Sequence, residues 1–142
     1  MYIWIVQKAL TQRLAIWAWV SIALGVLCFL PGSDFRVGLA FQFFGWALAS
    51  LALGGFGHLS ARRHQARLTL AEKMVAAPEE TSKMLLLLQG SAALGLLCLL
   101  GGLALVVFMQ AHGSFWAGAG TGITLQGVFV LFFSRYYARK LR

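Results

Sequence analysis

Four long runs of uncharged, mostly apolar residues alternate with short polar segments along the chain. Each run reaches or exceeds the roughly 17–25 residues that a helix needs to cross a bilayer. The pattern therefore predicts an all-α integral membrane protein with a single domain over residues 1–142. The four transmembrane helices are expected at about residues 14–30, 37–59, 84–111 and 115–134, with a loop at 60–83.

Short turn signals separate the helices within each half of the chain. Residues 31–34 read PGSD and residues 113–114 read GS. Proline cannot continue a helix, and glycine and serine permit a tight reversal, so the pattern predicts two sequential helical hairpins. Helix formers in 60–75 predict that the second helix continues beyond the membrane. The stretch 77–80, APEE, is predicted to end it and to start the third helix, because proline and acidic residues favour a first turn.

The first and third predicted helices share a repeated segment. Residues 21–30 read SIALGVLCFL and residues 91–100 read SAALGLLCLL, with seven of the ten positions identical. Arg13 precedes one copy and Lys83 the other, so both copies are expected to enter the membrane from the same side. We interpret the chain as a parallel internal repeat of two hairpins. The pair Gly101-Gly102 is the expected place for a bend in the third helix.

Composition supports a membrane protein, and the distribution of charge predicts its orientation. Hydrophobic residues make up 60% of the chain and charged residues 11%, and the net charge is +8. Every Lys and Arg except Arg36 lies before the first run, between the second and third, or after the fourth. The positive-inside rule therefore predicts that both termini and the central loop are cytoplasmic. Because topology accounts for the basic charge, no nucleic-acid partner is predicted.

Residues 1–12 leave two interpretations open. Gln7, Lys8 and Thr11 share one helical face, whereas Trp4 lies elsewhere. Such a pattern is typical of an N-terminal helix that lies in the membrane interface. The equal alternative is a simple cytoplasmic extension of the first transmembrane helix.

Small residues recur at four-residue spacing in all four predicted helices. Lipid provides no hydrophobic drive for helices to associate, and small side chains let their backbones approach closely. We expect these residues to pack against neighbouring helices or against a partner subunit. The predicted packing positions are Ser21, Gly25, Gly45, Ser91, Gly95, Gly118 and Gly122.

Three polar side chains, Ser21, Trp46 and Gln126, are expected near the membrane midplane. An amide without a partner is costly in hydrocarbon. Gln126 is therefore predicted to hydrogen-bond another helix, with Ser21 and Trp46 as the first candidate partners. The alternative is a polar patch that binds a substrate or a pigment.

The chemistry of the sequence points away from catalysis. Asp34, Glu72, Glu79 and Glu80 all lie outside the four runs, whereas ion-coupled transporters and proton relays usually need an ionisable group within the membrane. The sequence contains no nucleophile–base pair, phosphate-binding loop or metal-binding motif. We therefore predict no enzyme, no metal site and no resident cofactor.

Two smaller sets of residues are candidates for binding. His58 and His112 lie near the two faces of the membrane and are candidates for ligating a metal-centred pigment. Arg62, Arg63 and Arg67 form a basic stretch that is expected to contact lipid headgroups. Solvation of the histidines and a purely topological role for the arginines are the alternatives.

Two segments carry a resemblance to other proteins. FGWALASLALGGFGHLSARR, residues 44–63, and LQGVFVLFFSRYYA, residues 125–138, resemble a group of uncharacterised small bacterial four-helix inner-membrane proteins. The resemblance implies the four-helix architecture and a location in the bacterial inner (cytoplasmic) membrane. It implies no function.

These patterns predict a non-catalytic accessory or structural subunit that packs against a larger membrane complex, such as a bioenergetic one. Its expected partners are membrane lipids, including bound lipid, and other membrane protein subunits. The alternative is a homo-oligomeric small transporter or channel with Ser21, Gln42, Trp46 and Gln126 along a polar path. A channel needs these residues to face a continuous route for water, whereas a scaffold needs them satisfied within the protein.

Overall fold

The computed structural model describes residues 2–30 and 32–141 of the chain. These residues form α-helices and one short 3₁₀ turn, and no strand. The elements are α1 (Tyr2–Phe29), α2 (Asp34–Arg67), α3 (Leu70–Met109), η1 (Gln110–His112) and α4 (Ser114–Leu141). The all-α prediction is confirmed, and the four helices are long and apolar enough to cross a membrane.

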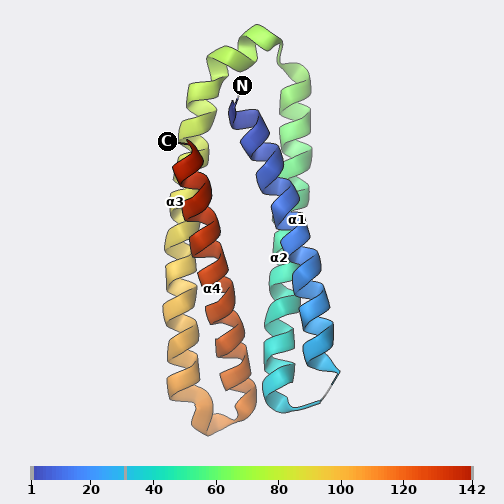
Figure 1. Ribbon diagram of the computed structural model, residues 1–142, viewed down its shortest axis with the longest axis vertical. Helices are drawn as coiled ribbons and strands as arrows, with labels where there is room; N and C mark the ends of the chain where they lie inside the picture. Colours follow the sequence, from blue (N-terminus) through green and yellow to red (C-terminus); the bar gives the residue numbers. More distant parts are fainter. Residues whose placement is uncertain (1, 31, 142) are drawn as a thin grey trace.

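The helices form two hairpins, α1 with α2 and α3 with α4, which lie side by side (Figure 1). Both chain ends and the connection from α2 to α3 lie at one end of the molecule, which we call the arch end. The two hairpin turns lie at the opposite end, the turn end. Most contacts between the hairpins join α2 to α4, whereas α1 makes few contacts with α3 or α4. The helices therefore form an open arrangement with α2 and α4 at its centre.

Each hairpin turn contains a glycine in a backbone conformation that other residues rarely adopt. Gly32 has a φ of 69° and Gly113 a φ of 128°, and both values lie in the left-handed region that glycine enters without a steric penalty. The two reversals occur where the Gly-Ser pairs of the sequence predict them.

The break between α2 and α3 differs from the prediction. It lies at residues 68–69, because α2 ends at Arg67 and α3 begins at Leu70. Thr69 and Glu72 form a capping box, in which the Thr69 N–H and hydroxyl donate to Glu72 Oε2 over 2.7 and 2.8 Å. The Glu72 N–H donates back to Thr69 Oγ1 over 3.4 Å. These bonds satisfy backbone and side-chain groups at the start of the helix, which explains why α3 begins there.

Pro78 lies inside α3 and does not start it. Proline has no N–H and removes one backbone hydrogen bond from a helix. Pro78 falls in the first part of α3, which curves over the arch end before it runs down beside α4 (Figure 1). The prediction of a helix break at 77–80 is therefore wrong, and the proline belongs to a curved helix.

Two further local predictions are decided by the helix bounds. α1 continues without a break from Tyr2 to Phe29, so the N-terminal residues extend the first helix and do not form a separate interfacial one. α3 is continuous through Gly101-Gly102. A Cβ added at Gly102 would lie 2.6 Å from the carbonyl oxygen of Gly120 on α4, so this glycine allows close packing and is not a helix break.

The two hairpins differ in how closely their helices approach. In α3 and α4, a Cβ added at Gly95 would lie 2.8 Å from the Leu131 nitrogen and 2.9 Å from the Gly127 carbonyl oxygen. In α1 and α2, a Cβ at the equivalent repeat position, Gly25, would meet the Phe44 ring at 3.0 Å. The second hairpin is thus packed backbone against backbone, and the first is packed through a side chain.

The contact between α2 and α4 near the turn end is the closest junction between the hairpins. A Cβ added at Gly118 would overlap the backbone of Phe35, and one at Gly38 would overlap that of Phe115. Gly122 faces the side chain of Gln42, and a Cβ added at Gly122 would lie 2.6 Å from Gln42 Cβ. Because backbones cannot rotate away as side chains can, this junction fixes the relative position of the hairpins at the turn end.

Candidate functional site

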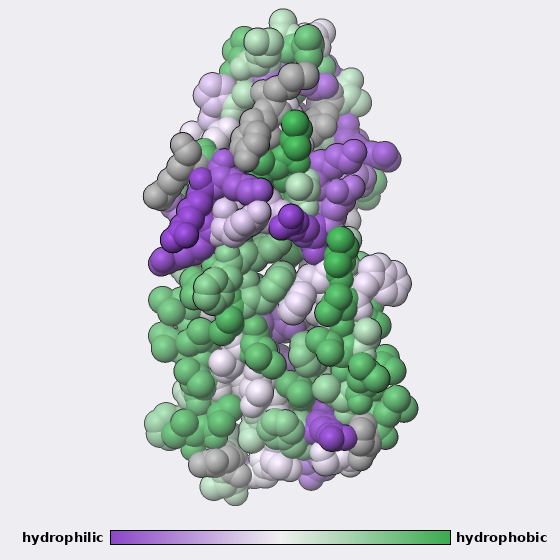
Figure 2. Space-filling model, in the orientation of Figure 1, coloured by the Kyte–Doolittle hydropathy of each residue, from purple (hydrophilic) through white to green (hydrophobic). Residues whose placement is uncertain are grey.

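The hairpins separate toward the arch end, and a cavity lies between them. About two turns beyond the close contact at Gly38, a Cβ added at Gly45 would find no atom within 4 Å. The central cavity, of about 160 Å³, begins beside this position, at Trp46 and Ala49, and Figure 2 shows a hollow between the hairpins in this region. All four helices line it: Leu10, Leu14, Trp17, Trp46, Ala49, Ser50, Leu53, Leu88, Ser91, Leu94, Gln126, Phe129, Val130, Phe133 and Ser134.

Gln126 is a buried polar side chain of this cavity, with 1% of its surface exposed. Trp17 Nε1 donates to Gln126 Oε1 over 3.0 Å. The Trp17 indole also stacks on Phe129, with ring centroids 3.8 Å apart and planes 6° apart. The predicted bond from Gln126 to another helix is confirmed, but its partner is Trp17 of α1 and neither Ser21 nor Trp46.

The sequence contains a feature that indicates Trp17 as a partner of Gln126, although only Ser21 and Trp46 are predicted. Trp17 precedes Ser21 by four residues, so both share one face of α1. An indole extends further from the backbone than a hydroxyl and combines a large apolar surface with one donor. It therefore reaches an amide across a gap that serine does not span.

Two buried polar atoms near the expected midplane lack a hydrogen-bond partner among the described residues. They are Gln126 Nε2 and Ser21 Oγ. Ser21 is fully buried and is not part of the cavity lining, whereas Gln126 is. An unpaired buried donor costs about 1–3 kcal/mol. An occupant of the cavity that offers an acceptor to Gln126 removes this cost and binds more tightly for that reason.

Aromatic side chains continue from the cavity toward the arch end. Phe129, Phe133 and Tyr137 recur every fourth residue on α4, with successive ring centroids 5.4 and 4.9 Å apart. Val6 of α1 and Leu88 of α3 pack with the buried Tyr137. Bulky side chains thus connect α1 to α3 and α4 in this region, where the backbone of α1 stays apart from theirs.

The predicted packing residues fall into two groups. One group is buried between helices: Ser21, Gly25, Gly95, Gly118 and Gly122. In the other group, Gly45 is exposed and Ser91 is half-buried, with its hydroxyl donating to the Leu87 carbonyl of its own helix over 2.8 Å. Gly45 and the exposed Ala49 leave a surface of small residues on α2 beside the central cavity.

The two candidate histidines do not share a site. His58 lies on α2 in a hollow of about 210 Å³ with Trp4 and Arg62, whereas His112 is exposed in η1 at the turn end. The described part of the chain holds no group of three or more His, Cys, Asp or Glu residues placed to bind a metal. Pigment ligation by either histidine stays a prediction.

The predicted headgroup residues are exposed on α2 near the arch end. Arg63 and Arg67 line a surface hollow of about 470 Å³ whose walls all come from α2. Arg62 faces the separate hollow beside His58. Contact with lipid headgroups stays a prediction for all three.

The chain belongs to a family whose function is not known. Residues 13–134 match the family described as "Family of unknown function (DUF6992)". No curated protein and no solved structure matches the chain. The match extends from α1 to α4, which agrees with the resemblance to uncharacterised small proteins, and function must be argued from the geometry.

Proposed function

We propose that this chain is a non-catalytic integral membrane protein that serves as an accessory or structural subunit of a larger membrane complex, such as a bioenergetic one. In this proposal it lies in a bacterial inner membrane with the arch end in the cytoplasm. The described Lys and Arg residues support this orientation, because all of them except Arg36 lie in the half of the molecule that carries the arch end.

The observation that carries the proposal is the opening between the hairpins. Ala49 lines the cavity there, and the exposed Gly45 lies one turn away on the same helix. Together they present an uncovered small-residue surface, and such surfaces let another helix approach closely in a bilayer. Gln126 adds a buried N–H donor without a partner at the same place. The cavity of about 160 Å³ is smaller than the roughly 300–1,000 Å³ of small-molecule pockets. A side chain of a partner subunit suits this volume better than a substrate or pigment does.

A homo-oligomeric small transporter or channel is the second candidate. The observation in its favour is that Trp46 and Gln126 line one cavity near the expected midplane. A route through a single chain would have to pass the turn end, where Gly38 and Gly118 hold α2 and α4 in close contact. The alternative therefore needs a route between copies of the chain.

Native purification in a mild detergent, followed by mass spectrometry and an absorption spectrum, tests the proposal. We expect stoichiometric partner chains with the wild type and their loss with Gly45→Leu. Gly101→Leu is the matched control, because Gly101 is also exposed with no atom within 4 Å of an added Cβ. A colourless homo-oligomer without partner chains would contradict the proposal, and flux assays in liposomes would then test the second candidate.

A further inference from the structure

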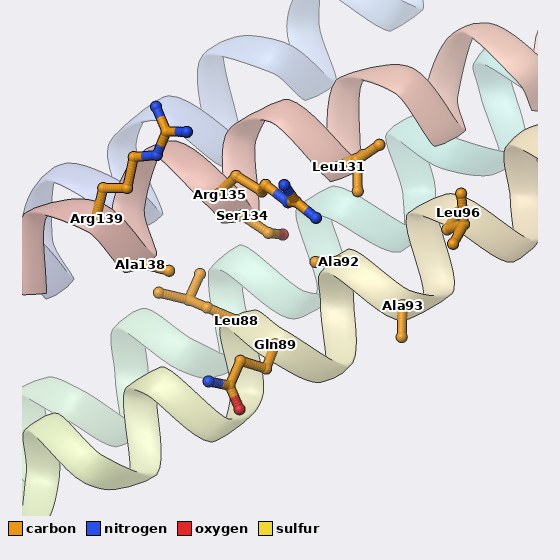
Figure 3. A pocket seen from close by; sticks show the side chains of 10 residues that line it. All are labelled: Leu88, Gln89, Ala92, Ala93, Leu96, Leu131, Ser134, Arg135, Ala138 and Arg139. Atoms are coloured by element: carbon orange, nitrogen blue, oxygen red, sulfur yellow. The ribbon is translucent and has the colours of Figure 1, made fainter. Parts of the chain in front are cut away.

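A second hollow lies between α3 and α4 toward the arch end. It shares Leu88 and Ser134 with the central cavity but also has two arginines in its lining. We call it the α3/α4 groove. Its volume is about 570 Å³. Figure 3 shows Gln89, Ala92 and Ala93 along α3, and Arg135 and Arg139 one turn apart on α4. The groove thus has a basic rim near the arch end and an apolar extension that ends at Leu96 and Leu131.

Small side chains explain why the groove exists. The α3 and α4 backbones are in close contact at Gly95, but one turn nearer the arch end the α3 wall consists of Ala92 and Ala93. Methyl side chains leave the space between the helices unfilled. The lining residues succeed one another along both helices, from 88 to 96 on α3 and from 131 to 139 on α4. The groove therefore runs along the helix axes, which is the direction of an acyl chain beside a transmembrane protein.

The arginines at the rim have no carboxylate to neutralise them among the described residues. Glu79 and Glu80 face Lys83, at 2.8 and 3.5 Å. Glu72 is bonded to Thr69 in the capping box. Neither Arg135 nor Arg139 forms an ion pair with any described acidic residue.

Neighbouring cations at the same end of α4 are placed differently. The Arg13 guanidinium lies over the Tyr136 ring, 5.7 Å from its centroid, and the Lys140 ammonium lies over the same ring at 4.8 Å. These two cations are therefore engaged by an aromatic side chain. Arg135 and Arg139, in contrast, line the groove without a ring or carboxylate partner among the described residues. Figure 3 shows the Arg139 side chain extending away from α3, so it must turn toward the groove to reach an anion there.

We infer that the α3/α4 groove binds one anionic phospholipid. The guanidinium groups of Arg135 and Arg139 hold its phosphodiester, and one acyl chain follows Ala92, Ala93 and Leu96 into the membrane. Guanidinium donors match phosphate oxygens in a two-pronged geometry, and basic pockets between transmembrane helices are typical sites for anionic headgroups. From Arg139 to Leu131 the groove follows eight residues of helix, about 12 Å, which is enough to guide the first part of a chain.

The hollow at Arg63 and Arg67 provides a comparison within the same molecule. These arginines are also one turn apart and near the arch end, but all of their hollow is formed by α2. A single helix gives no second wall to hold an acyl chain. The proposed lipid site therefore differs from the headgroup site expected from the sequence, although both carry two arginines.

Native mass spectrometry of the full chain in detergent tests the inference. Phosphatidylglycerol and phosphatidylcholine with identical acyl chains are added in separate titrations. We expect the wild type to retain one phosphatidylglycerol preferentially, and Arg135→Gln with Arg139→Gln to weaken retention roughly tenfold or more, since each basic residue near anionic lipid contributes appreciably. The matched control, Arg63→Gln with Arg67→Gln, removes the same charge and is expected to keep the lipid. Glycerol 3-phosphate at the same concentration is expected not to bind, because it lacks the acyl chains.

Three results would overturn the inference. They are equal retention of the two lipids by the wild type, equal loss in the two double variants, and binding of glycerol 3-phosphate as tight as that of the lipid. Circular dichroism establishes that each variant is helical. If the Arg135 and Arg139 double variant does not fold, Ala92→Phe tests the inference instead, because its ring fills the groove and both arginines are kept. Retention of phosphatidylglycerol by a folded Ala92→Phe protein would also overturn the inference.

Discussion

The two hairpins meet in different ways at the two ends of the molecule. At the turn end, Gly38 and Gly118 bring the backbones of α2 and α4 into contact. Toward the arch end, large side chains such as Trp17 and Phe129 span the distance between α1 and α4. Small residues leave no freedom in the spacing of two helices, whereas aromatic bridges leave unfilled volume between them. This is why the central cavity lies in the second region and not in the first.

The largest effect is expected from a methyl group at the turn-end junction. In Gly118→Ala, the new Cβ would overlap the Phe35 backbone, which has no rotamer to change, and the helices must move apart. We expect a loss of roughly 3 kcal/mol in the free energy of unfolding, measured by denaturant titration in detergent. Gly45→Ala is the control, since its Cβ meets no atom within 4 Å. Equal free energies of unfolding for the two variants would contradict the difference in packing between the turn end and the region of Gly45.

The two hairpins themselves give the next test. Gly95→Ala places a methyl against the α4 backbone and is expected to cost about 1–3 kcal/mol. Gly25→Ala meets the Phe44 ring, which can turn aside, so its cost is expected to be smaller. Unfolding of both variants is compared with that of Gly101→Ala, whose Cβ has open space. A larger loss for Gly25→Ala would show that the Phe44 ring is as rigid as backbone.

The bond across the central cavity should contribute less. Trp17→Phe keeps an aromatic ring near Phe129 but removes the donor to Gln126, so the whole amide is left without a partner. We expect it to lose about 1–2 kcal/mol, and Gln126→Leu to lose less because it also removes the unpaired Nε2. Thermal unfolding of both single variants and the double variant gives the coupling energy. Additive losses would mean that the bond contributes nothing to the contact between hairpins.

The smallest effect is expected where the hairpins are joined in sequence. Thr69→Ala removes the side-chain half of the capping box and should cost about 1 kcal/mol. Faster amide hydrogen exchange confined to the first turn of α3 is the expected readout. Thr81→Ala serves as the control, since the Thr81 hydroxyl bonds the Ala77 carbonyl of its own helix. Equal rates of amide hydrogen exchange in the two variants would mean that the capping box does not determine where α3 begins.

The number and order of the four α-helices follow from the hydrophobic pattern, because each helix carries a long apolar run and each hairpin turn a glycine. The short 3₁₀ turn η1 has no such signal. The predicted start of α3 is wrong because two local signals compete. Pro78 with its acidic neighbours is typical of a first turn, and Thr69 with Glu72 forms a capping box. The capping box sets the start, since it supplies partners to polar groups there, whereas proline only removes a donor.

The site was less predictable than the fold for a physical reason. The cost of burying an unbonded amide predicts that Gln126 has a hydrogen-bond partner. It does not predict how far apart the helices lie. That distance decides whether an indole or a hydroxyl reaches the amide. The groove at Arg135 and Arg139 is equally hard to predict, because the sequence does not show that the small residues Ala92 and Ala93 lie opposite these arginines. The sequence pattern identifies which side chains need hydrogen-bond partners. The distance between helices, which glycines at the turn end help to set, decides which partners they reach.

The joint at residues 68–69 makes the molecule divisible. Each hairpin has its own short turn and its own internal contact surface, and the chain passes between them once, at the end where both termini also lie. Two polypeptides separated at this joint would each carry a complete pair of helices. Their reassembly would depend mainly on the junction of α2 with α4. The side chains of Trp17 and Val6 on α1 add contacts to the other hairpin. The architecture thus suits a split reporter, in which recovery of the whole protein measures how often two separately expressed hairpins meet.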